Sequence, residues 1–245
     1  VSVGVAAHSV RAMPIESIVA LKTNLIEYPF HIHASEQRLE VERCKFHHEG
    51  LGPVGLLKEN GVLDGLTTLV HATHLEPGEA WSIKESGAMV CVCPSTEADL
   101  GDGILETTKL AKAGVPLSLG TDGQTLSSIL EEARRLEMNE RLRTEKRTAL
   151  VFNEGDDCAI PCLDAATVGG ARALGLDAGQ IATGLWADLV SIDLDTPTLA
   201  GLDDESLMAG IVFSADARAV RDVMVGGKWI IRDGTHVLES ESVRA

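Results

Sequence analysis

Four residues of the chain have the side chains and the placement that hydrolytic chemistry requires. His33, Glu36, His71 and Asp122 each lie at or just beyond the end of a short apolar or β-branched run. In a sheet of parallel strands the carboxyl ends gather at one edge, so these imidazole and carboxylate groups are predicted to converge. Such a set can hold a divalent cation and move the protons of a water bound to it. The pattern favours metal-assisted hydrolysis.

The elements that must position these residues alternate along the first part of the chain. Five β-rich runs, at residues 1–7, 28–34, 67–71, 89–93 and 115–119, are predicted to be strands. Helical patterns lie between and after them, at residues 14–27, 36–48, 53–60, 77–86, 104–113, 126–152 and 162–174, and residues 94–103 are predicted to be a loop. This alternation is typical of βα units around a parallel sheet, although five units are too few to close an eight-stranded barrel.

The pattern changes beyond Gly175. Short strands are predicted at residues 187–192, 211–213, 219–225 and 228–231, and Gly226-Gly227 is typical of a tight hairpin turn. We therefore predict two parts, an α/β part at residues 1–175 and strands of a small β domain at residues 176–245.

Composition limits the partners that the protein can have. Its 245 residues are 44% hydrophobic, and 37 acidic against 21 basic residues give a formal net charge of −16. This charge repels nucleic acid and anionic membrane surfaces, and no apolar run approaches the roughly 20 residues that span a bilayer. We expect a cytoplasmic protein whose partner is a small molecule, and an anionic substrate would need a local cationic contact.

The cysteines indicate reduced thiols and no disulfide framework. They form an odd, scattered set of five: Cys44, Cys91, Cys93, Cys158 and Cys162. Cys91 and Cys93 could be interpreted as a metal-binding pair. Their spacing places both on one face of a predicted buried strand, and we interpret them as packing residues.

Five stretches of the sequence resemble a known family. Residues 31–36 (HIHASE), 69–75 (LVHATHL) and 120–122 (GTD) resemble strands 5, 6 and 8 of the amidohydrolase superfamily, in its aminohydrolase branch. Residues 4–12 (GVAAHSVRA) and 93–103 (CPSTEADLGDG) are similar to the formimidoylglutamate deiminases within that branch. These similarities run in order across essentially the whole chain.

The resemblance implies an α/β fold with a (β/α)8 TIM-type barrel and part of a small β-sandwich domain. Residues 1–175 would supply about strands 4–8 of the barrel. The superfamily's first strand carries a His-x-His pair of metal ligands, and no segment upstream of His33 matches it. We therefore expect the chain to be a C-terminal portion of a longer polypeptide, weak or inactive by itself. Members of the family commonly pair, so a homodimer is expected.

The resemblance also implies roles for the four residues. His33 would be a metal ligand, and Asp122 would both bind the metal and accept a proton from the water. Glu36 would carry protons, and His71 would contact the attacking water or the tetrahedral centre. One divalent metal is implied, with Zn²⁺ as the family expectation, although the same ligand types accommodate iron and manganese.

Substrate recognition is assigned to the His-Ser-Val-Arg stretch. In the family its histidine and arginine line the substrate pocket, so His8 and Arg11 take that role here. A guanidinium can bind a carboxylate through two parallel hydrogen bonds. The implied reaction is the hydrolysis of N-formimino-L-glutamate to N-formyl-L-glutamate and ammonia, a step of histidine degradation. Gly123 replaces a serine of the family, which removes a hydroxyl near the implied metal.

Each residue also has an alternative interpretation that involves no chemistry. A histidine at a strand end, such as His33 or His71, is often only a satisfied polar residue. Glu36 can be an early helix carboxylate stabilised by the helix dipole, Asp122 can cap the following helix, and Arg11 can be an ordinary surface cation.

Five further polar residues are assigned structural roles. His31 is expected to pack or to support the site, and His74 to line or cap its loop. The acidic residues Glu97, Asp99 and Asp102 are expected to shape their loop by hydrogen bonding first and to serve the site second.

Two other functions remain open. One is a different amidohydrolase reaction, either deamination of a purine-like or guanidine-like substrate or the opening of an imidazolone ring. Arg11 distinguishes this case, because a substrate without a carboxylate gives the guanidinium little to bind. The other is a non-catalytic binding protein built on a decayed barrel, against which the joint presence of His33, Glu36, His71 and Asp122 speaks.

Overall fold

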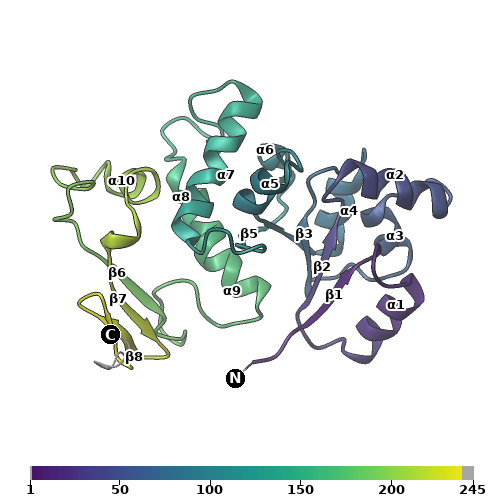
Figure 1. Cartoon of the computed structure of the whole chain (residues 1–245), viewed down its shortest axis with the longest axis horizontal. Coiled ribbons are helices and arrows are strands. Elements are labelled where there is room, and N and C mark those ends of the chain that lie inside the picture. The colour runs from purple at the N-terminus through teal and green to yellow at the C-terminus, as the bar shows by residue number, and fades with distance from the viewer. Residues whose placement is uncertain (1, 239–245) are drawn as a thin grey trace.

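A sheet of five parallel strands forms the centre of the larger part of the protein. The computed structural model describes residues 2–238 (Figure 1). The strands follow one another across the sheet in chain order: β1 Val5–Ser9, β2 Phe30–Ala34, β3 Thr67–His71, β4 Met89–Val92 and β5 Leu117–Leu119. The five predicted strands are confirmed with small shifts of their ends, and Val1 of the first prediction lies outside the described residues. In the register, Ser9 pairs with His33 and Ala34 pairs with His71, so the carboxyl ends of β1, β2 and β3 lie level with one another.

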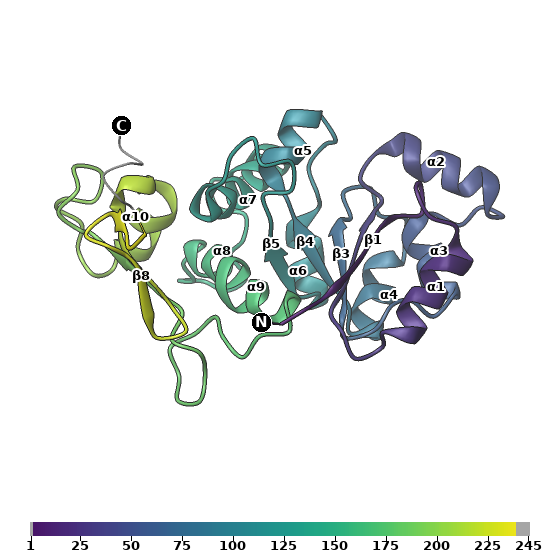
Figure 2. The same ribbon diagram turned by 60° about the horizontal axis from the view of Figure 1, so that its bottom comes forward.

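Helices connect these strands and continue beyond β5. Figures 1 and 2 show α1 to α4 beside the first three strands and α7 to α9 beside β5. Their bounds are α1 Ile15–Asn24, α2 Arg38–His47, α3 Pro53–Glu59, α4 Glu79–Ser86, α5 Pro94–Leu100, α6 Thr107–Ala113, α7 Ile129–Thr144, α8 Ala159–Asp164 and α9 Gly170–Ala173. A π turn, Ala165–Gly169, joins α8 to α9. It packs so closely on β5 that a Cβ on Gly169 would lie 2.0 Å from the Leu117 carbonyl oxygen.

The loop predicted for residues 94–103 is wrong, because α5 occupies its first part. Pro94 is the first residue of this helix, where a missing N–H costs no hydrogen bond. The buried carboxylate of Glu97 accepts the backbone N–H of Cys93 at 2.9 Å, which satisfies a donor at the start of the helix. The helix ends at Gly101, whose φ of +70° is in the left-handed region.

Apolar side chains from the sheet and from the helices around it form one core. Phe30, Ile32 and Leu69 of the strands are almost fully buried, and Ile18 of α1 and Leu136 of α7 pack in the same cluster. β4 is a continuous apolar run, as is typical of a strand covered on both faces, whereas β2 alternates apolar residues with His31 and His33.

The C-terminal part contains a second, antiparallel sheet, which lies at the opposite end of the molecule from α1 to α3 (Figure 1). Its strands are β6 Leu189–Ile192, β7 Val220–Val225, β8 Lys228–Arg232 and β9 Thr235–His236, in that order across the sheet. The predicted turn between β7 and β8 is confirmed, since Gly226 and Gly227 have φ values of +55° and +77°. Residues 239–245 of the predicted second part lie outside the described residues. The division near residue 175 and the sandwich arrangement stay predictions.

The strand predicted at residues 211–213 is wrong. These residues form the last turn of α10, Leu207–Phe213. Val212 is completely buried in the main core, and Arg134 of α7 donates from Nε to its carbonyl oxygen at 3.0 Å. None of the helices between residues 2 and 238 combines the length and the apolar character that crossing a membrane requires.

A buried lysine stabilises the segment that leads into β3. Lys22 is 5% exposed, and its Nζ donates to Asp64 Oδ1 at 2.8 Å. Burial works against the charged form of Asp64, but hydrogen bonds from Lys22, from Thr67 and from the Leu66 backbone amide lower the pKa of this carboxyl below its usual value. A lowered pKa in the folded state means that the ionised form stabilises the fold.

The stabilisation by Asp64 is therefore expected to depend on pH. It is complete above the pKa of the unfolded state, about 3.9, and is lost as the pH falls through the lower pKa of the folded state. Replacing Asp64 by Asn should reduce the free energy of unfolding by only about 1 kcal/mol at pH 7, because the Asp64 side chain is partly exposed. The reduction should be smaller at pH 3, where part of the carboxyl is protonated. Urea unfolding of both forms at the two pH values measures this difference. An equal loss at pH 3 and pH 7 would contradict the assignment.

Candidate metal and catalytic site

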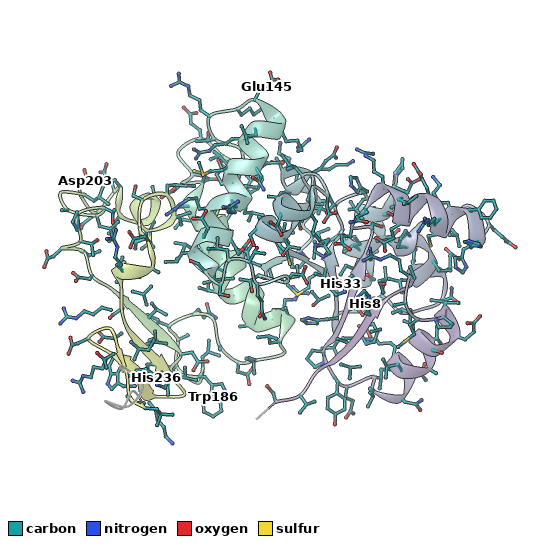
Figure 3. The ribbon with its side chains drawn as sticks, in the orientation of Figure 1. His8, His33, Glu145, Trp186, Asp203 and His236 are labelled. Atoms are coloured by element: carbon teal, nitrogen blue, oxygen red, sulfur yellow. The ribbon has the colours of Figure 1, made fainter. Side chains whose placement is uncertain are left out.

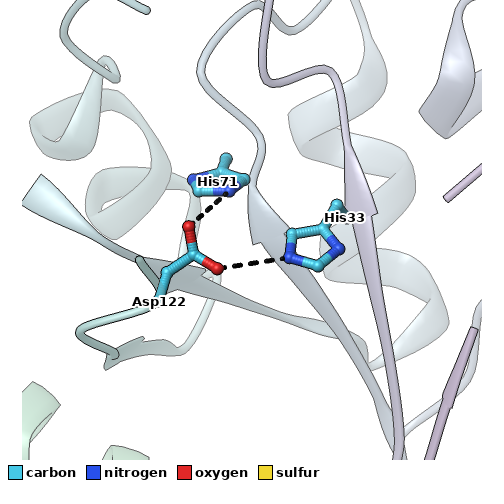
Figure 4. Close-up of side chains that lie close together, drawn as sticks. All are labelled: His33, His71 and Asp122. Atoms are coloured by element: carbon cyan, nitrogen blue, oxygen red, sulfur yellow. Dashed lines mark ion pairs between the residues drawn. The ribbon is translucent and has the colours of Figure 1, made fainter. Parts of the chain in front are cut away.

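Three of the predicted residues meet at the carboxyl ends of the parallel strands. His33 comes from β2, His71 is the last residue of β3, and Asp122 follows β5. His33 Nε2 lies 3.5 Å from Asp122 Oδ1, and His71 Nε2 lies 3.8 Å from Asp122 Oδ2 (Figure 4). One ligand atom from each residue lies within 4.8 Å of the other two, so the predicted convergence of these side chains is confirmed.

The backbone at these strand ends turns sharply to present the side chains. Ser35, His71 and Asp122 have φ values of +55°, +73° and +38°, in the left-handed region that residues other than glycine rarely adopt. Each such residue costs free energy of order 1–3 kcal/mol, and such residues gather at functional sites. Three of them, at the ends of β2 and β3 and just after β5, indicate that the fold maintains this geometry against a local cost.

One hydrogen bond determines which nitrogen of His33 faces the cluster as a ligand. His33 Nδ1 lies 2.7 Å from the His8 carbonyl oxygen, which can only accept a hydrogen bond, so Nδ1 carries the proton. In the neutral ring Nε2 then holds a lone pair, and this atom is the one that faces Asp122. Metal-binding histidines are commonly oriented in this way through their other nitrogen.

His71 carries the clearest sign that a partner belongs in the cluster. Its side chain is fully buried, and its Nε2 has no hydrogen-bond partner in the described structure, which is costly for a buried nitrogen. Burial opposes the charged ring, but Glu97, Glu36 and Asp122 outweigh it and raise the pKa of His71. Three carboxylates around one imidazole concentrate negative charge, which a divalent cation would balance. Two imidazole nitrogens and a carboxylate oxygen are also a donor set that suits Zn²⁺, so the residues present fit the implied metal.

Glu36 lies next to this cluster, as predicted. It is 6% exposed, and its Oε1 lies 3.8 Å from His71 Nε2. Its other carboxylate oxygen accepts a short hydrogen bond from Arg11, the predicted substrate-binding arginine. The same guanidinium faces a second acid, since Arg11 Nε is 3.7 Å from Glu40 Oε1. Arg11 is therefore beside the cluster, hydrogen-bonded to Glu36 and facing Glu40.

His8 lies on the opposite side of His33 from the metal-ligand cluster. The rings of His8 and His33 are 5.1 Å apart, and Figure 3 shows the two labelled residues next to each other. His8 is exposed, and its Nδ1 is 2.9 Å from Ser9 Oγ. The structure thus brings all six predicted site residues into one region.

Two buried acids lie near the site beside the six predicted residues. Glu97 was expected to shape its loop first and to serve the site second, and its Oε1 lies 3.4 Å from His71 Nδ1 as well as binding the Cys93 amide. Glu40 carried no prediction at all. In the helix predicted for residues 36–48, Glu40 would lie one turn after Glu36, and this spacing is the signal that could have indicated it.

The residues assigned structural roles have structural contacts. His31 Nε2 donates to the Ala173 carbonyl oxygen at 2.7 Å, and His74 Nε2 donates to the Asp102 carbonyl oxygen at 2.6 Å. Cys91 and Cys93 are free thiols, and a Cβ on Gly120 would contact both sulfur atoms, at 3.1 and 3.2 Å. These contacts agree with the interpretation of the two cysteines as packing residues.

Comparison with known proteins decides the family. Residues 1–230 match the sequence profile described as the Amidohydrolase family. The chain belongs to the amidohydrolase family. It is 40% identical, over all of its 245 residues, to the formimidoylglutamate deiminase of Pseudomonas aeruginosa, of which it covers 54%. It is 32% identical over 210 residues, 84% of the chain, to a 5-methylthioadenosine/S-adenosylhomocysteine deaminase of Halobacterium salinarum, of which it covers 46%. This amidohydrolase chain thus spans about half the length of the curated relatives that it matches.

Solved structures of amidohydrolases have the same fold. An amidohydrolase from Brucella melitensis superposes with a TM-score of 0.87 and 34% identity, covering 98% of this chain and 53% of its own. An adenosine deaminase from Xanthomonas campestris, solved with bound zinc, superposes with a TM-score of 0.89 and 25% identity, covering 98% of this chain and 54% of its own. The expected α/β fold with a parallel sheet is confirmed.

Proposed function

We propose that this amidohydrolase, over its full natural length, hydrolyses N-formimino-L-glutamate to N-formyl-L-glutamate and ammonia. The observation that carries the proposal is the convergence of His33, His71 and Asp122, with Glu36 beside them and Arg11 paired to Glu36. The similarity to a formimidoylglutamate deiminase along the entire chain supports this substrate over others. Histidine degradation is the pathway in which such a reaction belongs.

The metal is proposed to be one divalent cation, with Zn²⁺ favoured by the donor set. His33 Nε2 and Asp122 would hold it, and His71 Nε2 lies within reach of the same position. When bound, such a cation lowers the pKa of a water ligand to about 7, which supplies a nucleophile at neutral pH.

The side chains of the site can carry out the remaining steps. Water adds to the formimino carbon while Glu36 transfers the first proton of the water to the imino nitrogen, and His71 contacts the tetrahedral centre that results. Asp122 then accepts the second proton from the hydroxyl group of this centre. That proton passes to the amino nitrogen, so that the C=O bond forms, the C–N bond breaks and ammonia leaves. Because Glu36 is largely buried, water does not compete strongly for these protons.

The proposed reaction can be tested on the full-length protein by following ammonia release from N-formimino-L-glutamate in the presence of Zn²⁺. Turnover that is abolished by a chelator and restored by Zn²⁺ would support both the reaction and the metal. Release of ammonia from methylthioadenosine or S-adenosylhomocysteine, with none from N-formimino-L-glutamate, would support the alternative suggested by the relatives at lower identity.

Substitution of Arg11 tests the substrate class. Arg11→Ala is expected to raise KM for N-formimino-L-glutamate by about 10- to 100-fold, the effect of losing hydrogen bonds to a charged group. Arg43→Ala, at an exposed position on α2, is the matched control and should leave KM unchanged. Equal KM values for Arg11→Ala and the wild type would contradict binding of a substrate carboxylate by this guanidinium.

A further inference from the structure

The ion pair between Arg11 and Glu36 occupies two groups that the proposed reaction needs. The guanidinium assigned to the substrate carboxylate is paired with Glu36 Oε2, and Glu36 is the group assigned to the proton transfers. A substrate carboxylate that binds both terminal nitrogens of Arg11 competes with Glu36 Oε2 for one of them. The site therefore needs a second acceptor to which Arg11 can move when the substrate arrives.

Glu40 supplies such an acceptor. Its side chain is 1% exposed, and its Oε1 lies 3.7 Å from Arg11 Nε, beyond hydrogen-bond distance. This buried oxygen has no hydrogen-bond partner in the described structure. A shift of about 0.8 Å would bring the Arg11 Nε–H within charge-assisted hydrogen-bond distance.

The second oxygen of Glu40 has a different partner. Glu40 Oε2 accepts the backbone N–H of Glu36 at 2.7 Å, immediately after Ser35 with its left-handed φ of +55°. Glu40 thus contacts both the backbone that positions Glu36 and the guanidinium that pairs with it. A glutamine would be sufficient to hold the backbone. Burial of a second carboxylate beside one arginine is costly, and the backbone contact alone does not explain its charge.

We propose that Glu40 is a positioning residue that takes over Arg11 when a substrate with a carboxylate binds. The substrate carboxylate engages the terminal nitrogens of Arg11, the Arg11 Nε–H moves onto Glu40 Oε1, and Glu36 Oε2 is released for the proton transfers. Glu40 Oε2 keeps the Glu36 backbone in place throughout. This device makes the carboxylate of the substrate a condition for efficient turnover, and it rests on the proposed function.

The experiment compares two substrates in the full-length, Zn²⁺-loaded enzyme. N-formimino-L-glutamate carries the carboxylates, and N-propylformamidine has the same reacting group without them. Glu40→Gln keeps the size of the side chain and an oxygen for the Glu36 amide, but it removes the charge that attracts Arg11. It is expected to lower kcat/KM about tenfold for N-formimino-L-glutamate and to leave kcat/KM for N-propylformamidine unchanged.

Two further variants separate this effect from a merely structural one. Glu40→Ala also loses the hydrogen bond to the Glu36 backbone and should lower kcat/KM for both substrates. Arg11→Lys keeps the charge but has no Nε–H to move onto Glu40, so adding Glu40→Gln to Arg11→Lys should lower kcat/KM for N-formimino-L-glutamate no further. Glu42→Gln, at an exposed position on the same helix, should match the wild type on both substrates.

The possible failures can be told apart. A wild-type enzyme that releases no ammonia from N-formimino-L-glutamate overturns the proposed function and this inference with it. An active wild type in which Glu40→Gln loses activity equally on both substrates, or on neither, overturns only the role of Glu40.

Discussion

Glu36→Gln is expected to lower kcat of the full-length protein by about a thousandfold, with a change in KM of less than about fivefold. An amide of the same shape can neither accept nor deliver the proton, and general acid–base catalysis contributes about 10²- to 10⁴-fold. The amide oxygen can still accept a hydrogen bond from Arg11, so the substitution leaves the arrangement of the pocket largely intact. The effect should therefore be on kcat.

Steady-state ammonia release measures the loss of kcat, and the zinc content of the purified variant shows whether the metal site is intact. Glu36 is not among the three grouped ligands, so Glu36→Gln should retain as much zinc as the wild type. Glu42→Gln, at the exposed position on α2, is the matched control and should retain full activity. Activity above about a tenth of the wild-type value in Glu36→Gln would show that another group carries the proton.

The parallel sheet could be predicted from the sequence because each strand is a short run rich in apolar or β-branched residues. Residues such as Phe30, Ile32, Leu69 and Val90 are buried between layers, and polar residues lie at the strand ends. Residues 211–213 show where this signal fails. A short apolar run is equally compatible with a buried helix, and α10 is held in part by Arg134 of α7, which lies 78 residues away from Val212.

Local sequence determines the position of some site residues, and the packing of the helices determines that of others. His33, His71 and Asp122 lie at or near the carboxyl ends of strands, and strand ends can be located from local sequence. Glu40 resembles a solvent-exposed helix acid in the sequence, and Glu97 resembles a loop acid, although both lie on helices. Their burial, 4% and 2% exposed, depends on how α2 and α5 pack over the strand ends, which local patterns do not encode.

A second large effect is expected far from the site, at Glu137 of α7. This carboxylate is completely buried and accepts the backbone N–H groups of Ala149 and Leu150, both at 2.8 Å. It also pairs with Arg141 at 2.7 Å. Glu137 therefore ties the segment that follows α7 back onto the helix.

Glu137→Ala is expected to reduce the free energy of unfolding by about 3–5 kcal/mol, because it leaves two backbone donors and a guanidinium without their acceptor. Glu131→Ala on the same helix is the matched control. Glu131 also binds two arginines, at 2.8 and 3.1 Å, but its side chain is 24% exposed, and an exposed pair contributes at most about 1 kcal/mol. Urea unfolding with linear extrapolation measures both losses. An equal loss of unfolding free energy in the two variants would contradict this prediction. It would mean that Glu137 stabilises the protein only through its ion pair, as Glu131 does, and not through its backbone hydrogen bonds.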